Sequence, residues 1–269
     1  MKIEVNEINI DYRDEGSGLP VVFIHAFPLN QTMWDDQVAD LRHFCRTITL
    51  DLRGFGNSDV PPGPYSMDQM ASDVLGLMAA LEIEEAALVG LSMGGYVSLA
   101  FYRKYPGAVR AMMLADTRAS ADTHKARESR LNSAKKAETE GASAIADEMG
   151  PQLLGPSTLQ HKPEIARRIR SMIEANSPAG IAAAQRAMAE RMDSTYLLAG
   201  IDRPVLIAVG AEDSLTPVAE AEALRNGIPH SRMHVVPSAG HLSNLEQPAE
   251  FNRALGEFIR ELQRGESTE

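Results

Sequence analysis

The sequence predicts an α/β fold with a mostly parallel central sheet, helices on both faces of that sheet, and a helical cap. Three observations support this fold class. Short apolar runs alternate with amphipathic segments along most of the 269-residue chain, as in parallel sheets covered by helices. Several of these runs are apolar at every position, which is typical of strands buried on both faces. Between residues 118 and 198 the alternation stops, and an alanine-rich helical stretch carries no strand signal.

The expected elements divide the chain into a core and an insertion. Residues 2–15 should form an amino-terminal hairpin, followed by strands near 21–25, 46–51, 86–91, 109–116, 204–210 and 232–236. Helices are expected near 34–41, 67–81, 94–105, 217–226 and 248–262. Residues 1–117 and 199–269 would then form the core, and a helical cap of residues 118–198 would be inserted after the sixth strand.

Apolar residues of the expected cap recur at helical spacing. They form three sets: Ile145, Met149 and Leu153; Ile165, Ile169, Met172 and Ile173; Ile181, Met188 and Met192. Most of these side chains should pack against the protein and each other, whereas a minority should line a pocket. We place Met149 and Met188 in that minority. A roof of flexible methionines suits an apolar or adaptable acyl group and keeps water out.

The motif Gly90-Leu91-Ser92-Met93-Gly94 has the pattern G-x-S-x-G. It lies between the apolar run at residues 86–89 and a helical segment that begins at Tyr96. Such a strand, sharp turn and helix hold a serine in strained backbone geometry, and glycines are needed where a side chain would collide with either element. The pattern therefore predicts an exposed hydroxyl that acts as a nucleophile.

A serine hydroxyl becomes a good nucleophile only when a base accepts its proton and a third group orients that base. Asp213 follows the apolar run at residues 204–210 and therefore lies just past the carboxyl end of an expected strand. His241 lies in the loop after the last expected strand. Because ligands gather at the carboxyl ends of parallel strands, all three side chains are expected at one edge of the sheet.

These residues resemble those of the α/β-hydrolase family, in which the triad follows the order serine, acid, histidine along the chain. Two further segments carry the resemblance. His25-Ala26-Phe27-Pro28 is similar to the H-G-x-P oxyanion loop of the family, and the segment from Asp51 to Ser58 is similar to its D-x-R-G-x-G-x-S loop. The resemblance covers nearly the whole chain and, within the family, extends to 3-oxoadipate enol-lactonases and small carboxylesterases.

The resemblance implies a triad of Ser92, His241 and an acid. Some family members place the acid at the position of Asp116, which also ends a strand. The D-x-x-x-P sequence from Asp213 to Pro217 resembles the usual acid loop, so Asp213 is favoured over Asp116.

The resemblance also implies an oxyanion hole made by the backbone N–H groups of Phe27 and Met93. Ala26 stands where the family usually has glycine, and alanine tolerates fewer backbone conformations. The Phe27 N–H can still point into the site if the local φ is negative.

The implied function is a serine hydrolase of carboxylic esters or lactones that works through an acyl-enzyme and needs no cofactor. The same serine would also serve a cofactor-free perhydrolase or a carbon–carbon bond hydrolase, because a fold and a triad do not determine the substrate. A ligand receptor that retains the triad without turnover is a third alternative. A haloalkane dehalogenase is disfavoured, since it needs a carboxylate nucleophile where Ser92 stands.

Five other residues have both a functional and a structural interpretation. His25 either transfers a proton or packs beside the oxyanion loop through hydrogen bonds, and the packing role is favoured. Asp51 and Arg53 should brace the segment from Asp51 to Ser58, which we call the glycine loop, through charge-assisted hydrogen bonds. Arg118 is either a partner for a substrate carboxylate or a solvated arginine, and Trp34 either walls the acyl pocket or packs the first helix against the sheet.

Composition disfavours several other classes of protein. The formal net charge of −11 argues against a nucleic-acid partner, and no apolar stretch approaches the roughly 18 residues that span a bilayer. Cys45 is the single cysteine, and the first residues lack a signal-peptide pattern, so we expect a cytoplasmic protein. His124, His161 and His230 have no metal-ligand spacing, and no metal is expected. The expected partner is a small ester or lactone, and homo-oligomerisation stays open.

Overall fold

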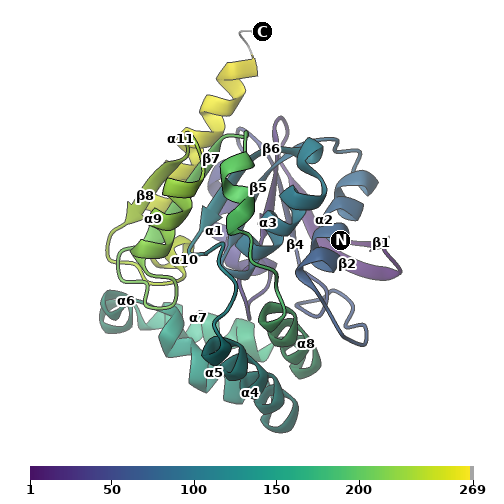
Figure 1. Cartoon of the computed structure of the whole chain (residues 1–269), viewed down its shortest axis with the longest axis vertical. Helices are drawn as coiled ribbons and strands as arrows, with labels where there is room; N and C mark the ends of the chain where they lie inside the picture. The colour runs from purple at the N-terminus through teal and green to yellow at the C-terminus, as the bar shows by residue number, and fades with distance from the viewer. Residues whose placement is uncertain (267–269) are drawn as a thin grey trace.

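The computed structural model describes residues 1–266, and within them eight strands form one sheet (Figure 1). Across the sheet the strands follow the order β1-β2-β4-β3-β5-β6-β7-β8. Their bounds are β1 Lys2–Val5, β2 Ile8–Glu15, β3 Pro20–Ile24, β4 Arg46–Leu50, β5 Ala86–Leu91, β6 Val109–Ala115, β7 Val205–Gly210 and β8 Arg232–Val236. The strands from β3 onward are expected from the sequence to within one residue at each end, and the α/β fold class is confirmed.

The direction of the strands brings the candidate residues together. Strands β3 to β8 pair in parallel, whereas β2 pairs with β4 and β1 with β2 in antiparallel fashion. The carboxyl ends of β5, β7 and β8 therefore meet at one edge of the sheet. Ser92 directly follows β5, and the loops after β7 and β8 carry Asp213 and His241.

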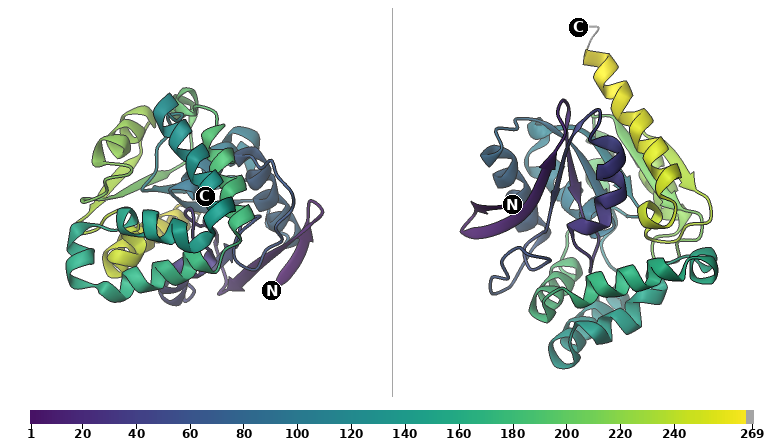
Figure 2. Two further views of the ribbon diagram at one scale, coloured as in Figure 1. Left: turned by 90° about the horizontal axis from the view of Figure 1, so that it is seen from below. Right: turned by 180° about the vertical axis from the view of Figure 1, so that it is seen from behind.

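Helices cover both faces of the sheet (Figures 1 and 2). On one face α1 packs against α11, and on the other face lie α2, α3 and α9. Their bounds are α1 Asp35–Leu41, α2 Met67–Ala80, α3 Met93–Lys104, α9 Val218–Gly227 and α11 Pro248–Glu266, with the short α10 Ser243–Glu246 before α11. These helices match the expected ones, except that α11 continues past the expected end at residue 262. No helix within residues 1–266 is long and apolar enough to cross a membrane.

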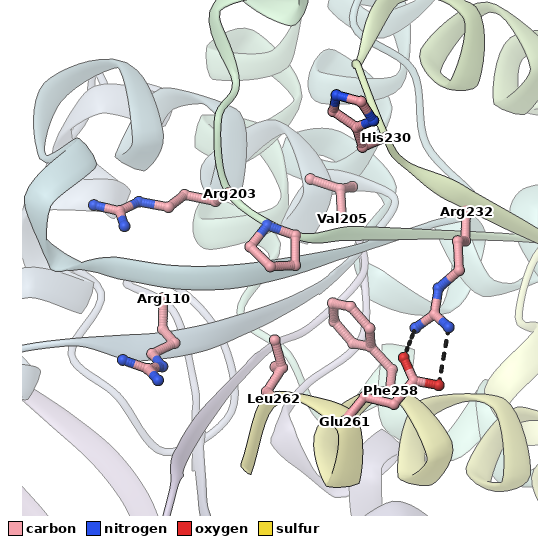
Figure 3. A pocket seen from close by; sticks show the side chains of 9 residues that line it. Arg110, Arg203, Val205, His230, Arg232, Phe258, Glu261 and Leu262 are labelled. Atoms are coloured by element: carbon pink, nitrogen blue, oxygen red, sulfur yellow. Dashed lines mark hydrogen bonds and ion pairs between the residues drawn. The ribbon is translucent and has the colours of Figure 1, made fainter. Parts of the chain in front are cut away.

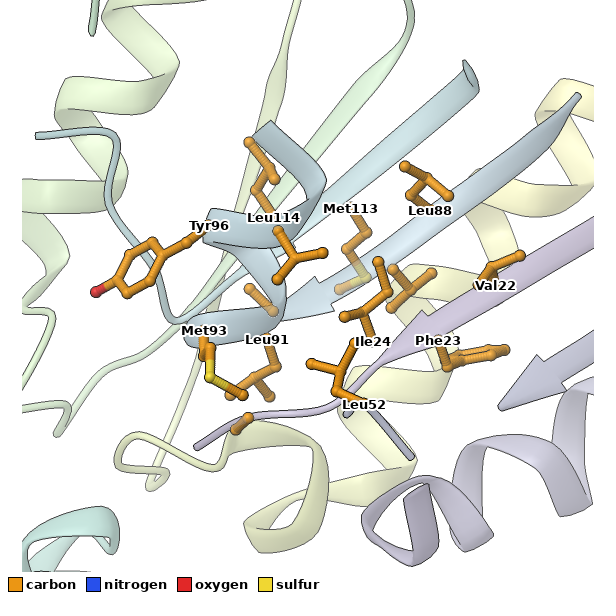
Figure 4. Packing of buried hydrophobic residues seen from close by; sticks show 14 of the residues in the cluster. Val22, Phe23, Ile24, Leu52, Leu88, Leu91, Met93, Tyr96, Met113 and Leu114 are labelled. Atoms are coloured by element: carbon orange, nitrogen blue, oxygen red, sulfur yellow. The ribbon is translucent and has the colours of Figure 1, made fainter. Parts of the chain in front are cut away.

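The sheet core is formed by apolar side chains from its central strands. Ile24 of β3, Leu88 of β5 and Leu114 of β6 are each fully buried, and Figure 4 shows them among the apolar side chains packed along these strands. Met93, the first residue of α3, is also fully buried, and in Figure 4 its side chain points toward Leu91. The residue after Ser92 is therefore fixed by core packing.

Residues 118–198, which we call the helical insertion, leave the core after β6 and return to it before β7. They contain α4 His124–Glu140, α5 Ala142–Met149, α6 Pro156–His161, α7 Pro163–Glu174 and α8 Pro178–Ala189. These helices gather at one end of the molecule, below the sheet in Figure 1. Ile145, Ile169 and Ile181 are fully buried, as expected. Met192 lies past the end of α8 and is 58% exposed, so its expected place on an apolar face is wrong.

Candidate active site

Ser92 occupies a strained turn between β5 and α3. Its φ of 55° and ψ of −110° place it in the left-handed half of conformational space. A Cβ on Gly90 would approach the carbonyl oxygen of Gly94 to 2.3 Å, and one on Gly94 would approach the carbonyl oxygen of Ile24 to 2.1 Å. Only glycine fits either position, which explains the spacing of the motif.

The side chains of Ser92, His241 and Asp213 form a hydrogen-bonded chain. The Ser92 hydroxyl lies 2.8 Å from His241 Nε2, and His241 Nδ1 lies 2.8 Å from Asp213 Oδ2. All three residues are buried. With Asp213 as acceptor, Nδ1 carries the proton and Nε2 faces the hydroxyl as an acceptor. This is the arrangement that lets an imidazole remove a hydroxyl proton.

Asp213 is held by its own loop. The N–H groups of Leu215 and Thr216 donate to Oδ1 at 2.8 and 2.9 Å, and the Thr216 hydroxyl donates to Oδ2 at 2.6 Å. Burial alone would raise the pKa of the Asp213 carboxyl, but the His241 charge and the hydrogen bonds from His241 and Thr216 outweigh it and hold that pKa below its ordinary value. The carboxylate form is therefore maintained beside His241.

Asp116, the alternative acid, has other partners. Its Oδ1 accepts from the Gly210 N–H at 2.8 Å, and its Oδ2 accepts from the Ser243 hydroxyl at 2.5 Å. Complete burial and the nearby negative charge of Asp213 raise the pKa of Asp116 well above its ordinary value. The acid in hydrogen-bond contact with His241 is Asp213, in agreement with the sequence preference.

The two expected oxyanion donors flank the serine. Phe27 follows β3 and lines the same cavity as Ser92, whereas Met93 begins α3, where the first N–H groups of a helix lack partners within it. Ala26 is fully buried and is not among the residues with positive φ. An alanine therefore fits this backbone without left-handed strain.

A cavity of about 290 Å³ lies between the serine and the helical insertion. Phe27, Ser92 and His241 line it from the core. The insertion contributes Arg118, Asp122, Ala126, Ser129, Arg130, Ser133, Glu148, Met149, Gln152, Leu153, Gln185 and Met188. Three of the four expected pocket residues, Arg118, Met149 and Met188, are thus at the cavity.

Trp34 does not line the cavity. It is fully buried between the sheet and α11, with its ring centroid 5.2 Å from that of Phe23 and 6.2 Å from that of Phe251. Such aromatic packing holds the first helix against the sheet. Of the two interpretations of Trp34, the structure supports the packing one.

The arginines of the cavity differ in their partners. Arg118 donates to the carbonyl oxygen of Leu215 and lies 3.4 Å from a Glu220 oxygen. Arg130, which the sequence analysis did not single out, shares Asp122 with Arg191: each guanidinium lies 2.5 Å from one carboxylate oxygen.

This cluster of Arg130, Asp122 and Arg191 holds two positive charges and one negative charge. Arg191 also stacks 4.2 Å from the Tyr96 ring centroid. Burial alone would raise the pKa of Asp122, but the Arg130 charge and the hydrogen bonds from both arginines hold it below its ordinary value. The cluster therefore has a net positive charge. Arg130 and Asp122 are the two residues of the cluster that line the cavity.

His25 and the glycine loop have structural roles. The Leu52 N–H donates to His25 Nε2 at 3.0 Å, so the proton sits on Nδ1, which lies 3.0 Å from the Ala26 carbonyl oxygen. Burial lowers the pKa of His25, which keeps the ring neutral. Asp51 accepts from the Asn57 N–H at 2.8 Å and thereby braces the loop, as expected.

Arg53 within this loop and Asn176 outside it connect the loop to other parts of the chain. Arg53 makes a buried two-pronged ion pair with Asp73 of α2, at 2.5 and 2.7 Å, so it braces the loop against a helix. Asn176, between α7 and α8, was not expected. Its Oδ1 accepts from the Gly56 N–H at 2.7 Å, and its Nδ2 donates to the Pro28 carbonyl oxygen at 2.7 Å.

A larger cavity of about 600 Å³ lies at the opposite edge of the sheet, where β6, β7 and β8 begin (Figure 3). Val205 and Phe258 contribute apolar surface to it, and Arg232 is paired with Glu261 at 2.7 Å. None of the candidate catalytic residues lines this cavity. Among residues 1–266, no group of three or more His, Cys, Asp or Glu side chains is arranged to hold a metal ion.

Comparisons with known proteins agree with this geometry. A family model described as alpha/beta hydrolase fold matches residues 20–248. The chain is 32% identical to 3-oxoadipate enol-lactonase 2 of Acinetobacter baylyi over 87% of this chain and 86% of the relative. Its structure is similar to that of a malate-bound thermophilic esterase from Thermogutta terrifontis, with a TM-score of 0.94, 43% identity and coverage of 97% and 98% of the two chains. It is also similar to an enol-lactonase from Burkholderia xenovorans, with a TM-score of 0.91, 29% identity and coverage of 97% and 100%.

Proposed function

The chain belongs to the alpha/beta hydrolase family, and from that premise we propose that it hydrolyses carboxylic esters or lactones with Ser92 as its nucleophile. The observation that carries the proposal is the hydrogen-bonded chain from Ser92 through His241 to Asp213, with 2.8 Å at each histidine nitrogen. A cavity opens directly onto the serine. The relatives named above, enol-lactonases and an esterase, support the same class of reaction.

In the proposed acylation step, His241 acts first as a base and then as an acid. His241 Nε2 removes the Ser92 proton while the oxygen attacks the substrate carbonyl carbon, and Asp213 holds the imidazolium that forms. The carbonyl oxygen becomes an oxyanion, which accepts from the N–H groups of Phe27 and Met93. When the tetrahedral intermediate collapses, the carbon–oxygen bond breaks and His241 gives its proton to the departing alcohol or enolate.

Deacylation repeats these steps with water. His241 removes a proton from a water molecule that attacks the acyl carbon, and the same proton then returns to Ser92 as the acid leaves. For a lactone, the departing oxygen stays attached to the acyl group, so one hydroxy or oxo acid is the sole product. The helical insertion, residues 118–198, acts as a cap in this proposal, and Met149, Leu153 and Met188 supply the apolar roof that limits water.

We further propose that the substrate carries a second, anionic carboxylate that binds Arg130. The excess positive charge at the Arg130, Asp122 and Arg191 cluster supports this, because a partly exposed guanidinium at a cavity can bind a carboxylate through charge-assisted hydrogen bonds. The acids named for the relatives, 3-oxoadipate and malate, both carry two carboxylates. Arg118, for which the sequence left open either this role or that of a solvated arginine, interacts with Leu215 and Glu220, and its pairing with Glu220 leaves no excess positive charge there.

Release of p-nitrophenol from acetate, butyrate and octanoate esters tests the hydrolase proposal. Wild-type protein should hydrolyse at least one ester, and Ser92→Ala should lose more than about a thousandfold in kcat. Ser72→Ala, which removes an α2 hydroxyl outside the cavity, is the matched control and should keep full activity. A folded wild-type protein that released no nitrophenol, or a fully active Ser92→Ala variant, would contradict the proposal.

Arg130→Met tests the carboxylate site. The variant should lose about 10- to 100-fold in kcat/KM for a p-nitrophenyl monoester of glutaric acid, because a charge-assisted hydrogen bond contributes about 1.5 to 3 kcal/mol. Its activity on the butyrate ester, which lacks the carboxylate, should change little. Arg127→Met is the control, since Arg127 lies on the same helix but pairs with Glu190 in an exposed contact. Equal losses on both esters would argue against a carboxylate site.

A further inference from the structure

Glu246 is a fully buried acid that the proposed mechanism does not use. It ends α10, five residues after His241. Its Oε1 accepts from the Gly240 N–H at 2.9 Å and from the Leu242 N–H at 3.2 Å. Oε1 therefore binds the backbone immediately before and immediately after the histidine.

The second oxygen of Glu246 reaches a different part of the chain. Oε2 accepts from the Gly155 N–H at 2.8 Å, in the helical insertion just before α6. The two backbones that Glu246 joins are in direct contact, because a Cβ on Gly240 would lie 2.2 Å from the Gly155 nitrogen. One carboxylate thus connects the histidine loop to the insertion at a point where neither segment has room to move closer.

We propose that Glu246 is a positioning residue for His241, whose carboxylate holds the backbone on both sides of the histidine and ties it to the helical insertion. The loop between β8 and α10 has no regular secondary structure of its own, so the direction of the imidazole depends on its contacts with Asp213 and Thr216 and on the backbone that Glu246 holds. A shift of about 1 Å in a catalytic group can cost on the order of a hundredfold in rate. This inference rests on the proposed hydrolase function.

A second acid provides a matched control. The carboxylate of Glu212 accepts from the Ser157 N–H at 2.9 Å and from the Ser157 hydroxyl, and so it also ties the core to the insertion. In contrast to Glu246, its side chain makes no hydrogen bond to the histidine loop. A variant of Glu212 therefore loses a similar tie between core and insertion without loosening His241.

The test compares Glu246→Gln with Glu212→Gln. Glutamine keeps the size of the side chain but replaces one accepting oxygen with an NH₂ group, which cannot accept from a backbone N–H. For a neutral p-nitrophenyl ester, we expect kcat of Glu246→Gln to fall by about 10- to 100-fold while KM changes by less than about threefold. Glu212→Gln should keep its kcat within about threefold, even if both variants lose similar thermal stability. Equal kcat values for the two variants would overturn the proposal.

Proton NMR gives a readout that does not need turnover. The downfield resonance of the Nδ1 proton shared by His241 and Asp213, identified by its loss in His241→Ala, should broaden or shift in Glu246→Gln and stay unchanged in Glu212→Gln. If wild-type protein hydrolyses no ester, the proposed function fails, and this resonance still decides the role of Glu246. If Glu246→Gln does not fold, Glu246→Asp, which is too short to reach both segments, is measured instead. An unchanged resonance in a folded Glu246 variant contradicts the inference.

Discussion

Two buried aspartates lie behind the candidate catalytic histidine, and their environments give them opposite tendencies. Asp213 receives donors at both oxygens and lies beside His241, which favours its charged form. Asp116 is farther inside the protein, and the charge of Asp213 adds to the effect of burial to favour its neutral form. Two neighbouring carboxyls with separated pKa values can therefore serve different purposes, one electrostatic and one structural.

Asp116→Asn should preserve activity and change the pH dependence of stability. The asparagine oxygen can accept from the Gly210 N–H, and its NH₂ group can donate to the Ser243 oxygen in place of the hydrogen bond that Ser243 now donates. The folded protein keeps the Asp116 proton that the unfolded chain releases above its ordinary pKa of 3.8. Wild-type stability therefore falls as pH rises between the unfolded and the folded pKa, by up to about 1.4 kcal/mol per pH unit, and the variant lacks this loss.

Urea unfolding of both proteins at pH values from about 5 to 8 measures this difference. The stability of Asp116→Asn relative to wild type should increase with pH over the part of this range that lies below the folded pKa of Asp116. Asp213→Asn is the contrasting variant, and its kcat should fall by about 10⁴-fold because the imidazole tautomer is no longer fixed. A stability difference between wild type and Asp116→Asn that does not vary with pH would show that Asp116 is ionised in the folded protein.

At the scale of elements, local sequence patterns predict the strands and the candidate triad, but not the contacts that hold them together. Gly90, Ser92 and Gly94 are recognisable because the turn between β5 and α3 places all three within five residues, although the limit on Gly94 comes from the Ile24 carbonyl oxygen. Contacts such as those of Asn176 and Glu246 join segments that are 120 and 91 residues apart along the chain. No periodicity or motif in the sequence predicts these hydrogen bonds, because they depend on how the insertion folds back onto the core.

Trp34 is a residue whose role the local sequence leaves undecided. Its place beside the oxyanion loop in the sequence is compatible with both a pocket wall and a core contact. The choice depends on Phe251 of α11, more than 200 residues away along the chain, which completes the aromatic cluster. Arg130 was missed for a related reason: its position on α4 says nothing of Arg191, with which it shares Asp122.

Asn176→Ala should weaken both the fold and the candidate oxyanion loop. The change removes the acceptor of the Gly56 N–H and the donor to the Pro28 carbonyl oxygen, and Asn176 itself is buried. Leaving buried polar groups without partners should cost at least about 2 kcal/mol of the free energy of unfolding. Because Pro28 follows Phe27, kcat should also fall. Urea unfolding and ester hydrolysis measure the two effects, and Asn132→Ala on the exposed side of α4 is the control. Unchanged stability and kcat would contradict this bridging role.

At the scale of the whole molecule, the helical insertion is joined to the core at several separate places. Glu246 binds Gly155, Glu212 binds Ser157, and Asn176 binds both Pro28 and Gly56. These contacts are buried or partly buried, so an insertion that opened alone would have to expose polar groups now satisfied inside the protein. We therefore expect the insertion and the core to unfold together in one cooperative transition.

The reactivity of the Cys45 thiol, which lies in the core, can be used to follow this unfolding transition. Its thiol is fully buried, donates to the Leu41 carbonyl oxygen at 3.3 Å, and has its pKa raised to about 12 by burial. Below about pH 9 the folded protein should therefore not react with a thiol reagent, whereas the unfolded chain should react within seconds to minutes.

Cys45 labelling across a urea series should have the same midpoint as the loss of helical circular dichroism, to which α4–α8 contribute. Cys45→Ala is the unreactive control. If the helical signal were lost at lower urea than the thiol is exposed, the insertion would unfold independently, and the buried contacts would be too weak to couple it to the core.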